Sequence, residues 1–478
     1  MEEIDLLPFK FRRLPDGSVA AVSASGQLSI LNSRELESLV RAPADLPLRK
    51  IAELQSKHFL MRRGAAGSYR LMLSRIASKN STLLAGPSLH ILVPTLQCEH
   101  TCRYCQVSRS LEADGFAMSV EDINAACDTV LQSPSDAITV EFQGGDPLIR
   151  FDLIKIAVNR LSQNVDSKRS IRFVVTSTLH QLTAEMCDFF RENGVVLSTS
   201  IDGPSSVHNK NRPLPSRDSY ERTVAGIQLA RQRIGSGAVA ALMTTTKESL
   251  KCPTEIVDEY VHLGLSEIVV RPLSPFGFAK RGVSTQKVLL DEFLSFYSKV
   301  FERVLYWNSA GVDIREGYAA LLLSKLLSST DSGYVDLQSV SAGGLSVLVY
   351  NYDGYVYPSD EARMLVEMGD ISLRLGKIGE SLQTLLESPV MSDLVKAGTS
   401  WTDPGCMECA YGGLCSPDPI SAKGEWGNFN VPVAWTEHCG RSLSMYDFLI
   451  QKLSSVDTAT LRLLHRWARP GVHREAAA

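Results

Sequence analysis

Short apolar segments alternate with longer amphipathic segments through the middle of the chain. Six of the apolar segments have the length and composition of β-strands: 89–95, 137–143, 171–177, 195–201, 238–244 and 267–273. Between them, apolar residues recur with helical spacing in segments such as 120–131, 183–193 and 220–231. Strands that alternate with helices predict βαβ units and a parallel sheet. We therefore predict an α/β fold, either an open twisted sheet or a partial barrel, with its chemistry where the strands end.

The regions on either side of this repeat have different patterns. Residues 1–85 predict a small α+β module, in which a hairpin turn at Pro15-Asp16-Gly17 joins two strands and helices begin near Ser33 and Leu48. The remaining divisions that we predict are a core barrel, a helical connection, a segment rich in Gly, Pro and Cys, and a C-terminal helix and tail: 86–284, 285–340, 341–445 and 446–478. One helix is predicted over residues 443–467, so it begins just before the last region.

Composition and charge exclude several classes of protein. The chain has 478 residues, of which 44% are hydrophobic and 21% charged, so it can bury a large core. Lys and Arg total 49 and Asp and Glu total 53, so the net charge is −4, and no basic stripe suggests nucleic-acid binding. No apolar run approaches the ~18 residues of a membrane span, and the acidic first residues lack the plan of a signal peptide. We expect a cytoplasmic protein that binds neither nucleic acid nor a membrane.

Seven of the ten cysteines fall into two motifs. The first cysteine motif, C-x3-C-x2-C, consists of Cys98, Cys102 and Cys105. The second cysteine motif, C-x2-C-x5-C with a more distant fourth member, consists of Cys406, Cys409, Cys415 and Cys439. In a reducing compartment these spacings favour metal ligation over disulfide bonds. The other three cysteines are expected to be small buried hydrophobic residues: Cys127, Cys187 and Cys252.

The first cysteine motif directly follows the first predicted strand of the core. Three thiolates can hold an Fe–S cluster that leaves one iron open, because a [4Fe–4S] cluster normally takes four cysteines. The alternative is a zinc ion for which His100, inside the motif, completes a set of three cysteines and one histidine.

The first cysteine motif resembles the hallmark of the radical SAM superfamily, C-x3-C-x-aromatic-C, with Tyr104 at the aromatic position. The resemblance implies a [4Fe–4S] cluster whose open iron binds the amino and carboxylate groups of S-adenosylmethionine. It also implies that reduction of the cluster cleaves the sulfonium and yields a 5′-deoxyadenosyl radical, and that Tyr104 lies near the adenine.

The ends of the next strands extend the resemblance. The GGEP motif of the family is similar to Gly144, Gly145, Asp146 and the proline that follows them. This similarity implies that backbone groups at this position reach the methionyl amine. Ser177 ends the third strand and Ser200 the fourth, within an S-x-D-G-P segment, and their hydroxyls are expected to bind ribose or carboxylate oxygens. The alternatives are a tight turn for the glycines, and helix capping or turn chemistry for the serines.

The second cysteine motif resembles the SPASM domain, which carries auxiliary Fe–S clusters in peptide- and protein-modifying radical SAM enzymes. The full pattern has more cysteines, and three of its positions are Ser341, Ser359 and Pro419 in this chain. All three correspond to ligands of the first auxiliary cluster, so the resemblance implies that only one auxiliary [4Fe–4S] cluster is kept. Structural zinc is the alternative for the four remaining cysteines.

Asp360 is a candidate catalytic base. It directly follows Ser359, and in the anaerobic sulfatase-maturing enzymes, which this segment resembles, an acidic residue at this place takes a proton from the substrate. The alternative is a surface carboxylate that pairs with Arg363 or a lysine.

Three longer segments, 9–14, 92–109 and 357–363, extend the resemblance over most of the chain. They are similar to the B-type radical SAM maturase of the His-Xaa-Ser system. This resemblance implies a partial (β/α)6 radical SAM barrel between a small N-terminal module and a C-terminal SPASM-like domain. It implies as partners a precursor peptide with His-Xaa-Ser repeats, a second radical SAM maturase, a small accessory protein, and an electron donor such as flavodoxin or ferredoxin. Residues 1–85 are expected to help grip a leader peptide, by strand addition to a sheet edge.

We therefore predict an enzyme that modifies a ribosomally made peptide after the 5′-deoxyadenosyl radical removes a hydrogen from it. One alternative is a sulfatase-type maturase that makes formylglycine, although the loss of the first auxiliary cluster argues against it. Another is a catalytically silent Fe–S protein that presents peptide to a second maturase. Two clusters of four irons predict about eight irons per chain.

Overall fold

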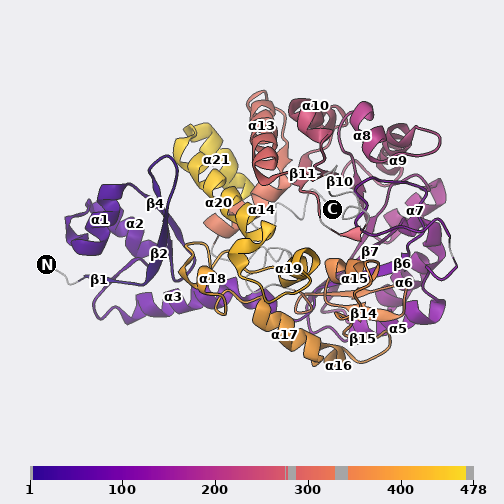
Figure 1. Cartoon of the computed structure of the whole chain (residues 1–478), viewed down its shortest axis with the longest axis horizontal. Helices are drawn as coiled ribbons and strands as arrows, with labels where there is room; N and C mark the ends of the chain where they lie inside the picture. The colour runs from indigo at the N-terminus through magenta and orange to yellow at the C-terminus, as the bar shows by residue number, and fades with distance from the viewer. Residues whose placement is uncertain (1–3, 113, 275, 278–286, 329–342, 470–478) are drawn as a thin grey trace.

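The computed structural model describes residues 4–112, 114–274, 276–277, 287–328 and 343–469, and its central feature is a ten-stranded sheet (Figure 1). Six parallel strands form its main part: β6 (Leu89–Thr95), β7 (Ala137–Gly144), β8 (Ser170–Thr176), β9 (Val196–Ser200), β10 (Val239–Thr244) and β11 (Glu267–Arg271). They lie side by side in chain order, so that five consecutive βαβ units join them. The predicted α/β fold is confirmed, and all six strands lie within two residues of the predicted bounds.

The sheet continues beyond these six strands at both edges. At one edge β12 (Arg315–Glu316) pairs in parallel with β11. At the other, β13 (Val347–Tyr350) pairs in parallel with β6, and β14 (Tyr355–Tyr357) and β15 (Gly376–Lys377) follow in antiparallel order. The sequence did not predict β13, β14 or β15, which place the segment after residue 343 inside the main sheet.

Helices cover one face of the parallel strands: α5 (Val120–Leu131), α6 (Phe151–Asn164), α7 (Ala184–Glu192), α8 (Ser205–Asn211), α9 (Ser219–Arg233) and α10 (Pro253–His262). They are joined by α13 (Leu290–Ser309) and α14 (Gly317–Leu327). The start of α5 shows why a helix begins there, because Ser119 and Asp122 cap each other's backbone N–H groups in a capping box.

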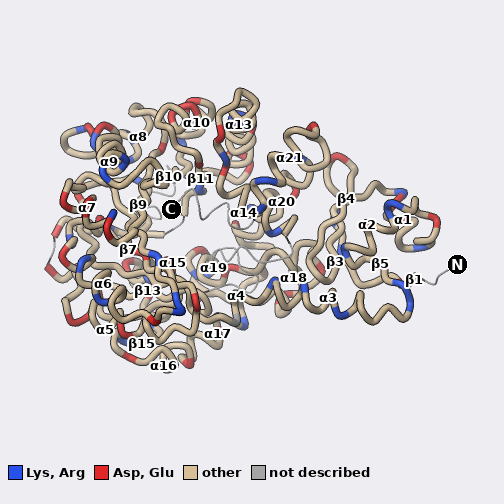
Figure 2. The backbone as a smooth tube through the Cα atoms, turned by 180° about the vertical axis from the view of Figure 1, so that it is seen from behind, with Lys and Arg blue, Asp and Glu red and all other residues tan. Residues whose placement is uncertain are grey.

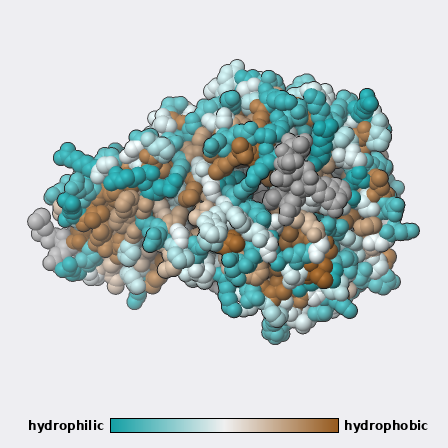
Figure 3. All heavy atoms as spheres, viewed as in Figure 1, coloured by the Kyte–Doolittle hydropathy of each residue, from teal (hydrophilic) through white to brown (hydrophobic). Residues whose placement is uncertain are grey.

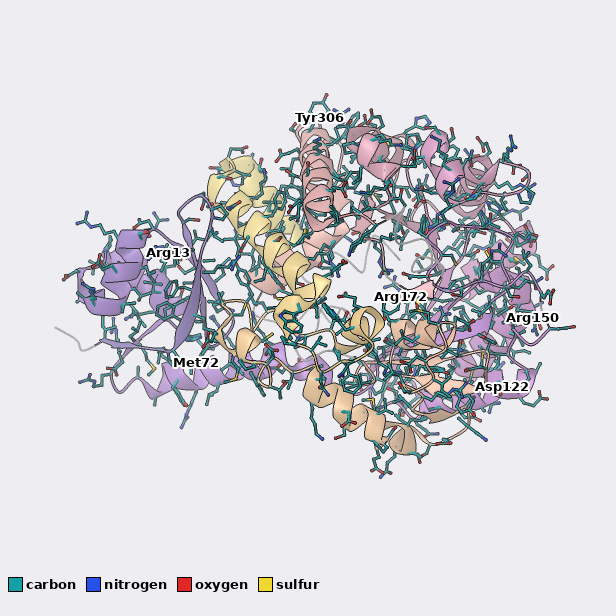
Figure 4. The ribbon with its side chains drawn as sticks, in the orientation of Figure 1. Arg13, Met72, Asp122, Arg150, Arg172 and Tyr306 are labelled. Atoms are coloured by element: carbon teal, nitrogen blue, oxygen red, sulfur yellow. The ribbon has the colours of Figure 1, made fainter. Side chains whose placement is uncertain are left out.

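The two faces of the strands differ in burial with a period of two. On β7, Ile138, Val140 and Phe142 are buried in the main core beneath the helices, whereas Glu141 between them is half-buried on the opposite face. We call the face turned away from α5–α10 the inner face. Figure 4 shows Arg172, an inner-face residue of β8, toward the middle of the molecule. The inner face is therefore the place where polar side chains of the core can meet a ligand.

Residues 4–84 form a module with a hydrophobic core of its own. Its strands are β1 (Ile4–Leu6), β2 (Phe9–Arg13), β3 (Val19–Ser23), β4 (Leu28–Leu31) and β5 (Leu60–Arg62), in which β2-β3-β4 make one antiparallel sheet and β1-β5 another. Its helices are α1 (Ser33–Arg41), α2 (Leu48–Ser56), α3 (Ala66–Lys79) and α4 (Ser81–Leu84). The predicted hairpin is confirmed, and Gly17 in its turn has a φ of 84°, which favours glycine.

The C-terminal part is helical: α15 (Asp360–Val366), α16 (Leu382–Leu386), α17 (Pro389–Ala397), α18 (Pro404–Glu408), α19 (Pro419–Trp426), α20 (Glu437–Ser455) and α21 (Thr458–Trp467). The prediction of one helix over 443–467 is wrong. Asp457 accepts hydrogen bonds from the N–H groups of Ala459 and Thr460, so it ends the first helix and caps a second one. Among the helices that the structure describes, none is both long and apolar enough to cross a bilayer.

Candidate active site

The first cysteine motif lies at the end of β6, in the loop that leads to α5. Hydrogen bonds hold the loop together at its base, from Leu96 N to Phe116 O (2.9 Å) and from Cys98 N to Ser110 O (3.0 Å). The three thiols lie within electrostatic range of one another. Burial raises the pKa of Cys98 above its ordinary value and that of Cys102 to about 12, so metal binding must displace the thiol protons.

Gly144 and Gly145 form the contact between the end of β7 and this loop. Gly145 N donates to Thr95 O (2.9 Å), and a Cβ at Gly145 would lie 2.2 Å from the carbonyl oxygen of Gln97. A Cβ at Gly144 would lie 2.3 Å from Thr95 O, and its φ of 127° is unsuited to other residues. Only glycine allows the two backbones to approach so closely, immediately before Cys98.

Asp146 joins the ends of β7 and β8. It is buried, and it accepts hydrogen bonds from Ser177 Oγ (2.7 Å), from Leu148 N (3.2 Å), and from both the N–H and the hydroxyl of Thr178. These contacts make Asp146 and Ser177 partners of each other and fix the rim beside the cysteine loop. Ser200, half-buried on the inner face, ends the neighbouring strand β9.

Tyr104 belongs to a buried network under the cysteine loop. Its hydroxyl donates to Asp202 Oδ2 (2.6 Å), Arg212 Nε donates to the same oxygen (3.3 Å), and the Arg212 guanidinium lies 5.2 Å from the centre of the Tyr104 ring. Arg103 N also donates to Asn211 O (3.1 Å), so the segment after β9 holds the cysteine loop in place. The sequence placed Asp202 in the S-x-D-G-P segment but did not predict its contact with Tyr104 and Arg212, although a position one strand end away is a signal for such a contact.

His100 faces this network. Its Nε2 lies 3.0 Å from Ser219 Oγ, and its ring centre is 4.2 Å from that of His180. Burial lowers the pKa of His100 to about 2, with His180 and Arg212 adding to the shift, so the ring is neutral. These contacts account for His100 as a packing residue of the loop.

The inner face brings Asp360 close to the parallel strands. Glu141 on β7 accepts a hydrogen bond from Thr176 Oγ1 (2.6 Å), and burial raises its pKa, with the charge of Asp360 adding to the rise. Asp360 begins α15, and its Oδ1 accepts from Arg363 Nε (2.7 Å), which is the ion pair that the alternative for Asp360 described. Glu141 was missed in the sequence, although polar residues at alternate positions of a strand indicate such a face.

The four cysteines of the second cysteine motif line one cavity of about 470 Å³. They belong to α18, to the loop after it and to α20, and their thiols lie within electrostatic range of one another. His438 Nε2 lies 4.0 Å from Cys415 Sγ and 3.0 Å from Ser416 O. Among the described residues, no three His, Cys, Asp or Glu side chains converge to hold a single ion. Four cysteines that line one cavity could hold either an Fe–S cluster, in which each thiolate binds its own iron, or a zinc ion.

The positions that depart from the SPASM pattern have other uses here. Ser359 caps α15, because its Oγ accepts from Ala362 N (3.2 Å), and Pro419 is the first residue of α19. Ser341 lies outside the described residues.

The N-terminal module closes one side of the second cysteine site. Figures 1 and 2 show the module beside α18 and α20, and Phe11, Arg12 and Arg13 of β2 line the cavity. Arg12 Nε donates to both carboxylate oxygens of Asp447 (3.0 and 2.9 Å), and Tyr411 Oη donates to one of them (2.7 Å). This contact joins residues 435 positions apart in the chain and was not predicted from the sequence.

Residues 92–259 match the model of the Radical SAM superfamily, a range that contains the first cysteine motif and the strands that follow it. The structure of native anSMEcpe with bound AdoMet is similar, with a TM-score of 0.65 and 16% identity, over 79% of this chain and 99% of that one. The crystal structure of Streptococcus suis SuiB bound to precursor peptide SuiA has a TM-score of 0.55 and 13% identity, over 91% and 100%. The chain therefore contains a radical SAM domain in an α/β fold, with the architecture of these two structures.

Two sequence relatives match shorter parts of the chain. An uncharacterized protein of Methanothermobacter thermautotrophicus is 23% identical over 178 residues, which is 37% of this chain and 64%, just under two thirds, of that protein. The serine-type anaerobic sulfatase-maturating enzyme of Bacteroides thetaiotaomicron is 28% identical over 142 residues, which is 28% of this chain and 34% of that enzyme.

Proposed function

We propose that this protein is a radical SAM enzyme that modifies a ribosomally made peptide. The observation that carries the proposal is the position of the three-cysteine loop at the carboxyl end of β6, beside the glycine edge of β7, within a radical SAM domain. Cys98, Cys102 and Cys105 would hold a [4Fe–4S] cluster, which together with S-adenosylmethionine would supply the radical chemistry that removes hydrogen from a C–H bond.

The residues of the chain position and protect this chemistry. Gly144 and Gly145 bring the end of β7 against the cysteine loop, and Tyr104 and Asp202 fix the loop from below. The inner face gives a substrate polar surroundings, and Asp360 there is the candidate base that takes a proton from the substrate. The cavity of the second cysteine motif is the proposed place of one auxiliary [4Fe–4S] cluster.

A peptide substrate is supported by the fold shared with SuiB, whose structure holds precursor peptide SuiA, and by an open strand edge in the N-terminal module. Within the described residues β2 pairs only with β3, so its other edge can accept a peptide strand. Phe11 on β2 and Tyr69, Leu71 and Leu73 on α3 are exposed, and Figure 3 shows hydrophobic atoms gathered on this module. We propose a precursor with His-Xaa-Ser repeats, together with the second maturase, accessory protein and electron donor of that system.

Three measurements test the proposal. Anaerobically reconstituted protein with dithionite and S-adenosylmethionine is expected to release 5′-deoxyadenosine, and none at all would support a silent peptide-presenting protein. Mass spectrometry of a coexpressed His-Xaa-Ser precursor is expected to show a change of mass, or deuterium uptake from solvent when a stereocentre is inverted. Removal of residues 1–85 is expected to weaken binding of the labelled precursor in a fluorescence anisotropy assay, and unchanged binding refutes the role of the module.

The sulfatase-maturase function is the second candidate, because the Bacteroides enzyme matches part of the chain. It predicts that a sulfatase peptide with a target Ser or Cys gains an aldehyde that reacts with a hydrazide probe. Reaction with this peptide but not with the His-Xaa-Ser precursor would favour the second candidate.

A further inference from the structure

Arg363 carries a buried guanidinium group that is only partly paired. Its side chain is 1% exposed, and Nε donates to Asp360 Oδ1 (2.7 Å). Nη1 and Nη2 are both buried and have no hydrogen-bond partner. A guanidinium has five N–H donors, so most of its capacity is unused, and leaving charged donors unpaired in the interior is costly.

Neighbouring acidic groups are engaged elsewhere. Glu367 accepts a hydrogen bond from the hydroxyl of Tyr352, and Glu361 accepts one from Ser359 Oγ (2.9 Å). Tyr352 lies near Arg363, whose charge acts to lower the pKa of this tyrosine. Other arginines of low exposure show the usual arrangement, since Arg315 pairs with Glu267 and Arg212 with Asp202. Among the described residues, only Arg363 has two buried guanidinium nitrogens without a partner.

The position of α15 places this group at the inner face. Ala362 and Met364, which flank Arg363, belong to a buried cluster with Ile91 and Val93 of β6. Ile91 is the register partner of Glu141 on β7, and Glu141 feels the charge of Asp360. The Arg363 guanidinium therefore lies beside the surface where the proposed substrate is bound.

We propose that Nη1 and Nη2 of Arg363 bind a carboxylate of a ligand at the inner face. A planar guanidinium matches the two oxygens of a carboxylate with two parallel hydrogen bonds, and the pairing removes the cost of the unpaired donors. The inference rests on the proposed function, which supplies two sources of a carboxylate: S-adenosylmethionine or an acidic group of the peptide. Both nitrogens are covered in the structure, so binding requires that the packing over them opens.

The experiment compares ligands with and without a carboxylate. The proteins are the wild type, Asp360→Asn, and Asp360→Asn/Arg363→Met, in which methionine fills space without charge and asparagine avoids a lone carboxylate. The probes are S-adenosylmethionine against its decarboxylated analogue, and the His-Xaa-Ser peptide against a form with all carboxylates changed to amides. Dissociation constants are measured by equilibrium dialysis on anaerobically reconstituted protein.

In one of the two ligand pairs, the analogue without the carboxylate is expected to bind Asp360→Asn about tenfold or more weakly than the ligand that has it, as for a charge-assisted bidentate contact. The double variant is expected to bind both members of that pair equally. The affected pair identifies the source. Discrimination here means the ratio of the two dissociation constants within a pair. If this ratio is the same in both variants for both pairs, the inference is overturned. If 5′-deoxyadenosine forms while no discrimination is lost, this inference fails and the proposed function stands. If discrimination is lost without any 5′-deoxyadenosine, the carboxylate site stands and the proposed function fails.

Thermal unfolding separates binding from a structural role. Replacing a buried unpaired charge by an apolar side chain is expected to leave the Tm of the double variant equal to or above that of Asp360→Asn. Arg374→Met is the matched control, because Arg374 donates to Tyr357 Oη (3.0 Å) and Asp353 Oδ2 (3.1 Å), so its loss is expected to lower the Tm without changing carboxylate discrimination. A lower Tm for the double variant than for Asp360→Asn, with unchanged discrimination, would assign Arg363 to structure alone.

Discussion

Gly145→Ala tests whether the contact between the end of β7 and the cysteine loop controls cluster assembly. The added Cβ would lie 2.2 Å from Gln97 O and 2.3 Å from Leu96 O, whereas real Cβ contacts essentially never fall below 3.0 Å. The two segments must therefore separate by at least 3.0 − 2.2 = 0.8 Å. Both oxygens belong to the backbone and cannot rotate away, and the hydrogen bond from Asp146 N to Gln97 O (2.8 Å) must stretch. Overpacking of this kind costs about 2–3 kcal/mol.

The displaced segment ends at Cys98, so we expect the iron content to fall as well as the stability. Anaerobic reconstitution of Gly145→Ala is expected to give about four irons per chain instead of about eight, because the first site is lost and the second is kept. The Tm of this 478-residue chain is expected to fall by about 2–3 °C. Gly67→Ala is the matched control, since Gly67 lies in α3, outside both cysteine motifs, and a Cβ there meets nothing within 4 Å. Full iron content with an unchanged Tm in Gly145→Ala would refute the reasoning.

Three further predictions concern the second cysteine site, a buried histidine and the N-terminal module. Changing Cys406 and Cys409 to Ala is expected to leave about four irons per chain; four irons plus one zinc in the wild type, measured by metal analysis, would instead assign zinc to this site. Burial lowers the pKa of His90 from 6.5 to about 4. Below pH 6.5 the unfolded state therefore binds more protons than the folded state, and the protein becomes less stable as the pH decreases. Urea unfolding is therefore expected to show that His90→Gln removes about 2 kcal/mol of the stability difference between pH 7 and pH 5. Arg12→Ala, like Asp447→Asn, breaks a partly exposed ion pair, so its expected cost in free energy of unfolding is less than about 1 kcal/mol. Limited proteolysis is nevertheless expected to release the N-terminal module faster from either variant than from the wild type, and equal digestion rates would contradict this.

The parallel core was predictable because its signals are local. Each strand of the core is a short apolar run such as the one ending at Thr95, and each helix has helical spacing and caps such as Ser119. The position of the first cysteine motif, directly after the first core strand, followed from the same local signals. The same reasoning placed Gly144 and Asp146 at the rim, because the ends of adjacent parallel strands meet there.

The missed features depend on pairing between distant segments. Val347–Tyr350 is four residues long and all buried, and nothing in four apolar residues tells that it joins β6 rather than a separate sheet. The break before α21 depends on one cap, Asp457, within a pattern that is otherwise helical. The unpaired nitrogens of Arg363 depend on how distant segments pack around its side chain. The local sequence is the same whether such an arginine is buried or exposed, so it does not predict unpaired nitrogens.

The parallel pairing of β6 with β13 has a consequence for the order of synthesis. Leu89 pairs with Val347, so one edge of the strand that leads into the first cysteine motif stays open while more than half of the chain is still being made. An open hydrophobic edge is a template for wrong pairing, and contacts between such distant segments form slowly. The nascent protein is therefore exposed to aggregation until β13 is made. Iron insertion into the first cysteine motif is expected to be most productive after that moment, and fragments that stop before residue 347 are expected to be insoluble.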